Sequence, residues 1–507
     1  MKQMVRIVCL VLSLLMLVAA FVACDDKSGG ELEATTTTTT TTTTPPPGEE
    51  LPSVVSNLGI IPASVDYDGA VFNVLFWPNA RQQLWPETMV EGESIQNDLY
   101  LRCRMIEDEL GIVVDPTFKA SHMSGGADGE DLYNEALEGT TAYEAICSYS
   151  LYPPKMVLEG ILTDLYSMEY PDTRMEWYPS DIDAWEIKNR LFFVANNSSV
   201  RNILANWVIY ANRTMIENKG LENIEQVVID GNWTLDTLKT YSRNWASEAE
   251  SNAAKEEADR VYGFTASDRT VMMGFYHGAG FSVIKRDANG DPAYAYFDKT
   301  QIEQISNFLD KFLDICHSPE FGGGPTNGWT TNYNVPLSNE NSVFHASAMD
   351  MYWMIDEDET FAIIPFPKLD EQQNRYYGVT NNAYDVWCVP NSATDSAIGG
   401  MLIEATSYND YSEIAPKFFD MDFKYRYSSD ENGVKIFDLI RQSYTADFGR
   451  IWIDIGTPYG ALNNCYSARP ETMLLQNTFA NEIQGTKMTA NTNMRNLKKL
   501  IESLYAE

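Results

Sequence analysis

A long threonine run near the N-terminus limits where this chain can build a core. Residues 35–44 are all threonine, and residues 45–47 are prolines. Such a segment has no apolar surface to bury, so it cannot offset the entropy lost on ordering and stays extended. The β-branched and proline residues also stiffen it. We therefore expect a tether over residues 24–68 and a folded body that begins at about residue 69.

The segment before the tether is typical of an export signal. Lys2 and Arg6 supply a positive start, and an almost wholly apolar run over residues 7–23 ends at Cys24. No positive stop-transfer cluster follows the run. Residues 21–24 (Phe-Val-Ala-Cys) resemble a bacterial lipobox, in which the cysteine is acylated and becomes the new N-terminus. We expect residues 1–23 to be a lipoprotein signal peptide. Cys24 would then anchor the protein on the extracellular face of the cell membrane, in a Gram-positive bacterium. The alternative is an ordinary secretory signal that happens to end in a cysteine.

The size and charge of the body restrict its architecture and its partners. Residues 69–507 are too many for one compact core, so two lobes are expected. The chain has 36 basic and 72 acidic residues. A surface this acidic repels phosphate backbones, which excludes nucleic acid as an expected partner.

Cysteine and histidine are too sparse for a structural framework. No C-x-x-C pair occurs and the chain has four histidines, so neither a disulfide framework nor a structural zinc site is expected. One disulfide pairing remains open. The cysteines beyond Cys24 are Cys103, Cys147, Cys316, Cys388 and Cys465.

Hydrophobic periodicity predicts alternating strands and helices. The apolar positions repeat every second residue or run continuously in the short segments, and recur at helical spacing in the long ones. A β-α-β order of this kind implies strands covered by helices. We expect strands at 71–76, 112–114 and 143–147, and helices at 96–110, 302–312 and 494–504.

Residues 287–291 (Asp-Ala-Asn-Gly-Asp) predict a hairpin turn between the apolar segments 281–284 and 293–297. A calcium loop is the alternative, but its glycine comes too early and no glutamate closes it. We expect the hairpin, and no metal or cofactor.

Recognised catalytic motifs are absent from the sequence. It contains no G-x-S-x-G, H-E-x-x-H or G-x-x-x-x-G-K pattern. Pairs of carboxylates are common because carboxylates are common. The sequence therefore gives no positive indication of an enzyme.

Several segments together resemble the extracellular solute-binding proteins of carbohydrate ABC transporters (family 1). Residues 231–238 (Gly-Asn-Trp-Thr-Leu-Asp-Thr-Leu) are similar to the family's G-x-W-T-W-D-x-L signature, with Leu235 in place of the second tryptophan. Residues 262–264, 343–351 and 362–367 resemble the strands that follow it. A later block, 437–440 with 447–449, resembles lipoproteins of Firmicutes in the same superfamily.

The resemblance implies a two-lobed α/β fold of the periplasmic-binding-protein type (type II), with mixed β-sheets flanked by helices and a hinge. Lobe 1 would comprise residues 69–170 and 342–405, and lobe 2 residues 171–341 and 406–507. The ligand, a carbohydrate and in our prediction an oligosaccharide, would lie between the lobes and favour their closed form. The partners would be the ligand and the permease subunits, and the protein would act as a monomer.

The same resemblance places ligand contacts where strands end and loops converge. A sugar ring has an apolar face and a rim of hydroxyls, so aromatic rings, amides and carboxylates are the expected residue types. No catalytic residue is expected. The candidate ligand-binding residues are Trp77, Asn79, Ser148, Tyr149, Tyr152, Asp268, Tyr276, Trp353, Asn381, Asn382, Tyr384 and Tyr459.

Two other functions remain open. The scaffold could bind another small solute, such as a peptide or a polyamine, or act as a surface adhesin. Alternatively, the aromatic and acidic residues could belong to a surface glycoside hydrolase.

Overall fold

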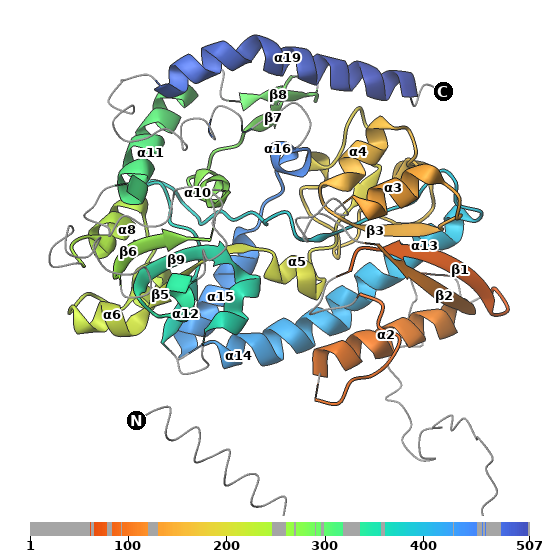
Figure 1. Cartoon of the computed structure of the whole chain (residues 1–507), viewed down its shortest axis with the longest axis horizontal. Helices are drawn as coiled ribbons and strands as arrows, with labels where there is room; N and C mark the ends of the chain where they lie inside the picture. The colour runs from red at the N-terminus through yellow and green to blue at the C-terminus, as the bar shows by residue number, and fades with distance from the viewer. Residues whose placement is uncertain are drawn as a thin grey trace, which may run out of the picture. The chain divides into compact units, whose positions relative to one another are not determined.

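The computed structural model describes residues 61, 65–78, 84–92, 94–119, 130–245, 260–267, 270–288, 290–295, 299–317, 335–355, 360–428, 430–453, 459, 462 and 478–504. The signal peptide at 1–23, most of the tether at 24–68, Cys24, Asn79 and Asp268 therefore lie outside the described residues. Residues from 57 onward form one compact unit. Figure 1 shows its helices and strands.

The first sheet has five strands in the order β2-β1-β3-β11-β4. β1 pairs in parallel with β2 and β3, whereas β11 is antiparallel to both β3 and β4. The predicted strands at 71–76, 112–114 and 143–147 all lie in this sheet, with small shifts at their ends. The strands are β1 (Ala70–Phe76), β2 (Ile112–Phe118), β3 (Ala145–Tyr149), β4 (Phe193–Val194) and β11 (Asp385–Cys388).

The helix between β1 and β2 is the one predicted at 96–110. α2 (Ser94–Leu110) buries Leu99, Cys103, Ile106 and Leu110, which recur at helical spacing on one face. Gly111 follows in the left-handed conformation, at φ 62°, and ends the helix. α13 (Ser396–Asn409) packs against both α2 and β3.

The second sheet has four strands in the order β10-β5-β9-β6. β5 is antiparallel to β9 and β10, and β6 is parallel to β9. All residues of β5, β9, β10 and β6 are buried, as expected for strands covered by helices. The strands are β5 (Trp207–Asn212), β6 (Tyr262–Ala266), β9 (Ser342–Ala348) and β10 (Phe361–Ile364).

The helices around the second sheet include the predicted one at 302–312, which lies within α11. α8 and α11 contact β6, while α7 and α15 contact β10. These helices are α7 (Ile224–Ile229), α8 (Leu235–Ser242), α11 (Lys299–His317) and α15 (Glu431–Ser443). The other short helices are α3 (Asp131–Glu138), α4 (Tyr152–Leu158), α5 (Val200–Leu204), α6 (Arg213–Asn218), α10 (Val271–Gly278), α12 (Val335–Ser338), α16 (Phe448–Ile451), η1 (Leu165–Ser167), η2 (Ile182–Ala184) and η6 (Met349–Met354).

The tryptophan signature at 231–238 joins α7 to α8 in the second sheet's helical layer. Gly231 adopts a positive φ of 74° just after α7. The Trp233 indole is fully buried, and its Nε1 donates to the carbonyl of Pro365 at 2.8 Å. Thr234 caps α8, because its hydroxyl accepts from the backbone N–H of Thr237 at 3.2 Å. The signature therefore has a structural role here: it fixes α8 to the segment after β10.

Three segments run between the two sheets. The first contains α5 and leads from β4 to β5, and the second covers residues 365–384 between β10 and β11. These two pair with each other, because the N–H of Asn381 donates to Ala205 at 2.8 Å and Trp207 donates to Val379 at 3.1 Å. The third is a continuous helical run from α13 through η7 (Asp410–Ile414), η8 (Pro416–Phe423) and α14 (Lys424–Arg426), in which η7 and η8 are π-helical.

The sheet pairing differs from the predicted lobe boundaries at three strands. β9 and β10 fall within 342–405, the range predicted for lobe 1, yet they pair in the second sheet. β4 falls within 171–341, predicted for lobe 2, and pairs in the first sheet. The reason is that β5 needs a partner on each edge, which β9 and β10 supply. The chain returns to the first sheet only at β11.

The predicted hairpin is confirmed. β7 (Ile284–Arg286) and β8 (Pro292–Tyr294) are antiparallel, and the N–H of Asp287 donates to Asp291 at 2.8 Å. The predicted C-terminal helix is α19 (Thr478–Leu504), which contacts α4, β8 and α11. Figure 1 shows it in dark blue, running beside β8.

Within the described ranges, Cys103, Cys147, Cys316 and Cys388 are buried free thiols. No group of three His, Cys, Asp or Glu side chains in those ranges could hold a metal ion. None of the helices in the described part of the chain has the length and apolar character needed to cross a membrane.

Candidate functional site

The first candidate residues lie where β1 and β3 end and β11 begins. Trp77 follows β1, and its indole Nε1 donates to Asp385 Oδ1 at 2.8 Å. Arg201 Nη1 donates to the same oxygen at 2.6 Å, and the guanidinium lies 4.2 Å from the centre of the Trp77 ring. Burial raises the pKa of Asp385, and Arg201 opposes that rise. Trp77 is thus held on its edge and on its face by two charged neighbours.

Three aromatic candidates pack beside this cluster. Tyr149, at the end of β3, makes an edge-to-face contact with Trp77 at 5.3 Å. Tyr152 lies 6.2 Å from Tyr149 and stacks on Tyr133 at 5.8 Å. Ser148 is fully buried and donates to the carbonyl of Tyr149 at 3.1 Å. The structure therefore brings Trp77, Ser148, Tyr149 and Tyr152 together, as expected for residues that follow neighbouring strands.

A pocket of about 250 Å³ lies where the three crossing segments meet. It is lined by aromatic side chains from four separate parts of the chain, together with amides, hydroxyls, one carboxylate and one guanidinium. The aromatic lining residues are Trp177, Tyr178, Tyr384, Tyr411 and Tyr444. The polar lining residues are Glu176, Ser180, Asn197, Ser198, Asn202, Asn206, Thr380 and Arg441.

The polar stretch after β4 forms one wall of this pocket. Asn196 Oδ1 accepts from the N–H groups of Ser198 and Ser199 at 2.9 and 2.6 Å, which turns the chain. Ser199 then caps α5 by accepting from the N–H of Asn202 at 3.1 Å. The Asn202 side chain exchanges hydrogen bonds with the backbone of Asp385, at 2.7 and 3.1 Å. The pocket wall is therefore tied directly to the cluster around Trp77.

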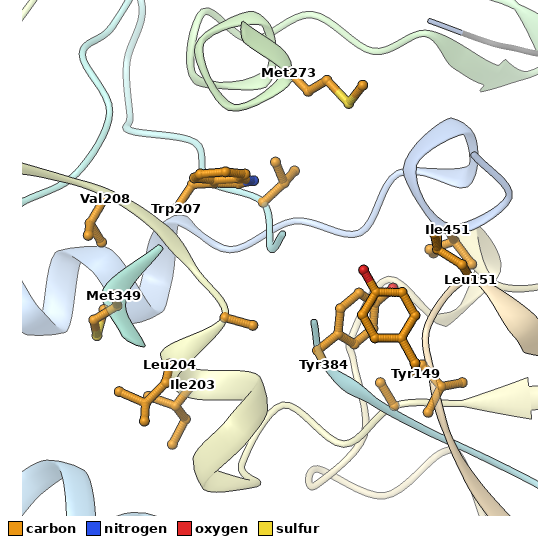
Figure 2. Packing of buried hydrophobic residues seen from close by; sticks show 14 of the residues in the cluster. Tyr149, Leu151, Ile203, Leu204, Trp207, Val208, Met273, Met349, Tyr384 and Ile451 are labelled. Carbon is orange, nitrogen blue, oxygen red and sulfur yellow. The ribbon is translucent and has the colours of Figure 1, made fainter. Parts of the chain in front are cut away.

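Two tyrosine hydroxyls in the pocket stay protonated at physiological pH. Burial raises the pKa of Tyr384 to about 12. Burial also raises the pKa of Tyr444 well above its usual value, and the neighbouring Tyr384 and Asp181 add to the rise. A neutral phenol can both donate and accept a hydrogen bond. Figure 2 shows Tyr384 and Tyr149 among the buried residues of this region, together with Trp207 and Met273.

A third tyrosine of the pocket is fixed from behind by a buried carboxyl group. Tyr178 donates to Glu404 Oε2 at 2.9 Å, and the N–H of Asp172 donates to the same oxygen at 3.0 Å. Glu404 is 1% exposed, and burial raises its pKa to about 7.

The candidates Tyr276, Tyr459 and Trp353 do not line this pocket. Tyr276 is fully buried in α10, and its hydroxyl donates to Ser282 at 3.2 Å. The Tyr459 hydroxyl and His277 Nε2 are 2.5 Å apart, and burial lowers the pKa of His277 to about 3. Tyr459 is therefore bonded to a neutral imidazole. Trp353 in η6 is 50% exposed.

Asn381 and Asn382 belong to the second crossing segment. Asn381 Oδ1 accepts from the N–H of Ala383 at 2.5 Å, and the carbonyl of Asn382 accepts from Ser150 Oγ at 2.7 Å. These two hydrogen bonds fix the loop before Tyr384. Of the predicted residues that the structure describes, Tyr384 alone lines the 250 Å³ pocket.

Sequence reasoning missed most of the pocket. Trp177, Tyr178, Asn202, Asn206, Tyr411, Arg441 and Tyr444 were not among the candidates. The polar run 196–199, directly after the Phe193–Val194 strand, was a usable signal, because ligand loops follow strands. Nothing local distinguishes Arg441 or Tyr444, which reach the pocket from the end of a helix.

Comparison with known proteins defines the fold. No family model matches the chain, and no curated protein matches its sequence. Among solved structures, the galacto-N-biose-/lacto-N-biose I-binding protein of an ABC transporter from Bifidobacterium longum is 13% identical, with a TM-score of 0.53. The similarity covers 85% of this chain and 98% of that one. The cyclic α-maltosyl-1,6-maltose binding protein from Arthrobacter globiformis is 11% identical, with a TM-score of 0.53, over 86% of this chain and 100% of that one.

These similarities place the chain in a structural class. It has the two-lobed fold of solute-binding proteins, with mixed sheets flanked by helices, as the sequence predicted. Both neighbours are binding proteins, and neither is an enzyme by name.

Proposed function

We propose that the protein is the substrate-binding component of an ABC importer and that it captures a carbohydrate. The observation that carries this proposal is the pocket between the crossing segments, which is lined by tyrosine and tryptophan rings together with amides and hydroxyls. Aromatic faces suit the C–H face of a sugar, and the amides and neutral phenols suit its hydroxyls. The two structural neighbours are named for binding disaccharide and cyclic maltosaccharide ligands.

The location of the pocket suits a receptor that closes around its ligand. Its lining comes from all three segments that connect the sheets, so movement of one sheet relative to the other changes its shape. A sugar that binds more tightly to one arrangement shifts the population toward it. We propose that the permease recognises the sugar-bound arrangement, and that Cys24 holds the receptor at the membrane.

The pocket volume bears on ligand size. At about 250 Å³ it is below the roughly 300–1,000 Å³ of pockets that enclose drug-sized ligands. We propose that one ring of an oligosaccharide occupies it, and that the remaining rings extend outside it.

Calorimetric titration with mono- and oligosaccharides tests the proposal. Tyr444→Phe removes one hydroxyl from the pocket and should weaken binding roughly 3- to 10-fold, the effect of one hydrogen bond. Tyr241→Phe is the matched control, since Tyr241 lines a different pocket beside α8. Binding of a peptide or polyamine in place of any sugar would change the ligand class. Release of a hydrolysed product would replace the transport role with an enzymatic one.

A further inference from the structure

One arginine of the pocket forms no ion pair within the described residues. Arg441 lines the pocket from the end of α15, and its guanidinium lies 5.1 Å from the centre of the Phe419 ring. The charges of Asp420 and Asp438 act on Arg441 from a distance, and both carboxylates form ion pairs with Lys424. Within the described residues, Arg441 forms no ion pair, so its N–H donors remain available to the pocket.

A second arginine beside the pocket is buried without a counter-ion. Arg450 is 5% exposed, and its Nε and Nη2 donate to the carbonyl of Thr380 at 3.1 and 3.0 Å. Its Nη1 faces only the Met273 sulfur, at 3.6 Å. Thr380 is itself part of the pocket lining. Asp447 is close in sequence, but burial raises its pKa to about 7, which leaves it partly protonated at neutral pH.

The other buried arginines are compensated. Arg102, Arg201 and Arg213 each have a carboxylate oxygen at 2.6 to 2.8 Å, with Asp410, Asp385 and Glu225 as partners. A buried cation without a partner is costly, and this chain has twice as many acidic as basic residues from which to supply one. Within the described residues, Arg450 is thus the one fully buried arginine without an ion pair, and Arg441, which is half-buried like Arg286, also forms none.

We infer that the carbohydrate is an acidic one, a uronic-acid type sugar whose carboxylate binds the Arg441 guanidinium. This inference rests on the proposed function and specifies its ligand. A planar guanidinium can hold a carboxylate by two parallel hydrogen bonds, which a neutral hydroxyl cannot match. Arg450 places a second positive charge beside the pocket, where it donates to the backbone of Thr380.

The one acidic lining residue does not cancel this arrangement. Glu176 is exposed, and its carboxylate interacts with the Tyr411 hydroxyl. It has no ion pair with Arg441 among the described contacts. Glu176 therefore remains free to accept from sugar hydroxyls, whereas Arg441 serves the carboxylate.

The test compares digalacturonate with its methyl ester, which lacks the two negative charges and carries a methyl group on each carboxyl group. We expect the wild-type protein to bind the acid about 10- to 100-fold more tightly than the ester, as for a charge-assisted pair. Arg441→Gln should remove most of that preference, chiefly by weakening binding of the acid. Arg426→Gln is the control, because Arg426 is an exposed arginine paired with Asp422.

The outcomes separate this inference from the proposed function. Equal wild-type affinity for acid and ester, or for neutral oligosaccharides, overturns the acidic ligand and leaves the carbohydrate receptor in place. An acid preference that survives Arg441→Gln overturns the role of Arg441. If no carbohydrate binds at all, the proposed function itself fails. The comparison of acid and ester uses the wild-type protein, so it holds even if a variant fails to fold.

Discussion

The buried carboxyl group of Glu404 makes the stability of this protein depend on pH. Glu404 lies on α13, is 1% exposed, and accepts two hydrogen bonds on one oxygen, from Tyr178 and from the backbone of Asp172. Burial is the largest cause of its raised pKa, about 7, against roughly 4.3 in an unfolded chain.

The sign and size of the effect follow from this difference. Between about pH 4.3 and 7 the folded state binds the Glu404 proton more tightly than the unfolded state does. The free energy of unfolding therefore falls as pH rises through that window, and the group's stabilisation is lost above pH 7. A gap of nearly three pH units corresponds to an upper value of about 3 to 4 kcal/mol.

Glu404→Gln should remove this dependence. The glutamine carbonyl oxygen can accept both hydrogen bonds, so the variant should resemble the wild type near pH 5. At pH 8 it should be more stable by about 2 to 3 kcal/mol, because no buried charge forms. Urea denaturation at both pH values, followed by tryptophan fluorescence, measures the difference.

The control is Glu303→Gln, which removes an exposed carboxylate from α11. Other titrating groups, such as Asp447, are present in all three proteins and cancel in the comparison. A stability difference between Glu404→Gln and the wild type that is the same at pH 5 and pH 8 would refute the reasoning.

Two further substitutions test the contacts that hold the fold. In the wild type, Arg102 Nη1 lies 2.6 Å from Asp410 Oδ1, and Asn196 donates to the other carboxylate oxygen. Arg102→Met leaves the buried Asp410 without its cation. The free energy of unfolding, measured by urea denaturation, should fall by about 3 to 5 kcal/mol. Adding Asp410→Leu should restore most of that loss, and a double variant as unstable as the single one would contradict a charge-based cause. Thr234→Ala removes the cap of α8 and should cost about 1 kcal/mol, whereas Thr240→Ala, at an exposed position within the helix, should change stability by a few tenths. Equal effects of the two threonine substitutions would argue against the capping role.

Local patterns were sufficient to predict much of the first sheet. The largely apolar run at 71–76 matches β1, and the helical spacing of Leu99, Cys103, Ile106 and Leu110 matches α2. The Asp-Ala-Asn-Gly-Asp sequence also predicted the β7–β8 hairpin correctly, because the conformation of a short turn depends mainly on its own residues.

Long-range pairing and the pocket were beyond the reach of these patterns. β9 and β10 pair with β5 although they are far from it in the sequence. Nothing in their residue pattern indicates which of the two sheets they belong to. The π-helical run from Asp410 to Phe423 has no simple periodic signature. Tyr384 was predicted because it precedes a strand. Arg441 and Tyr444 lie at the end of α15, and they line the pocket only because the tertiary fold places that end of the helix there.

A crystal structure of the protein with its tightest-binding sugar would show directly whether this pocket binds the ligand. We expect a sugar ring to contact Tyr384 and Tyr444 between the crossing segments. A sugar bound at another surface, with this pocket holding only solvent, would contradict it.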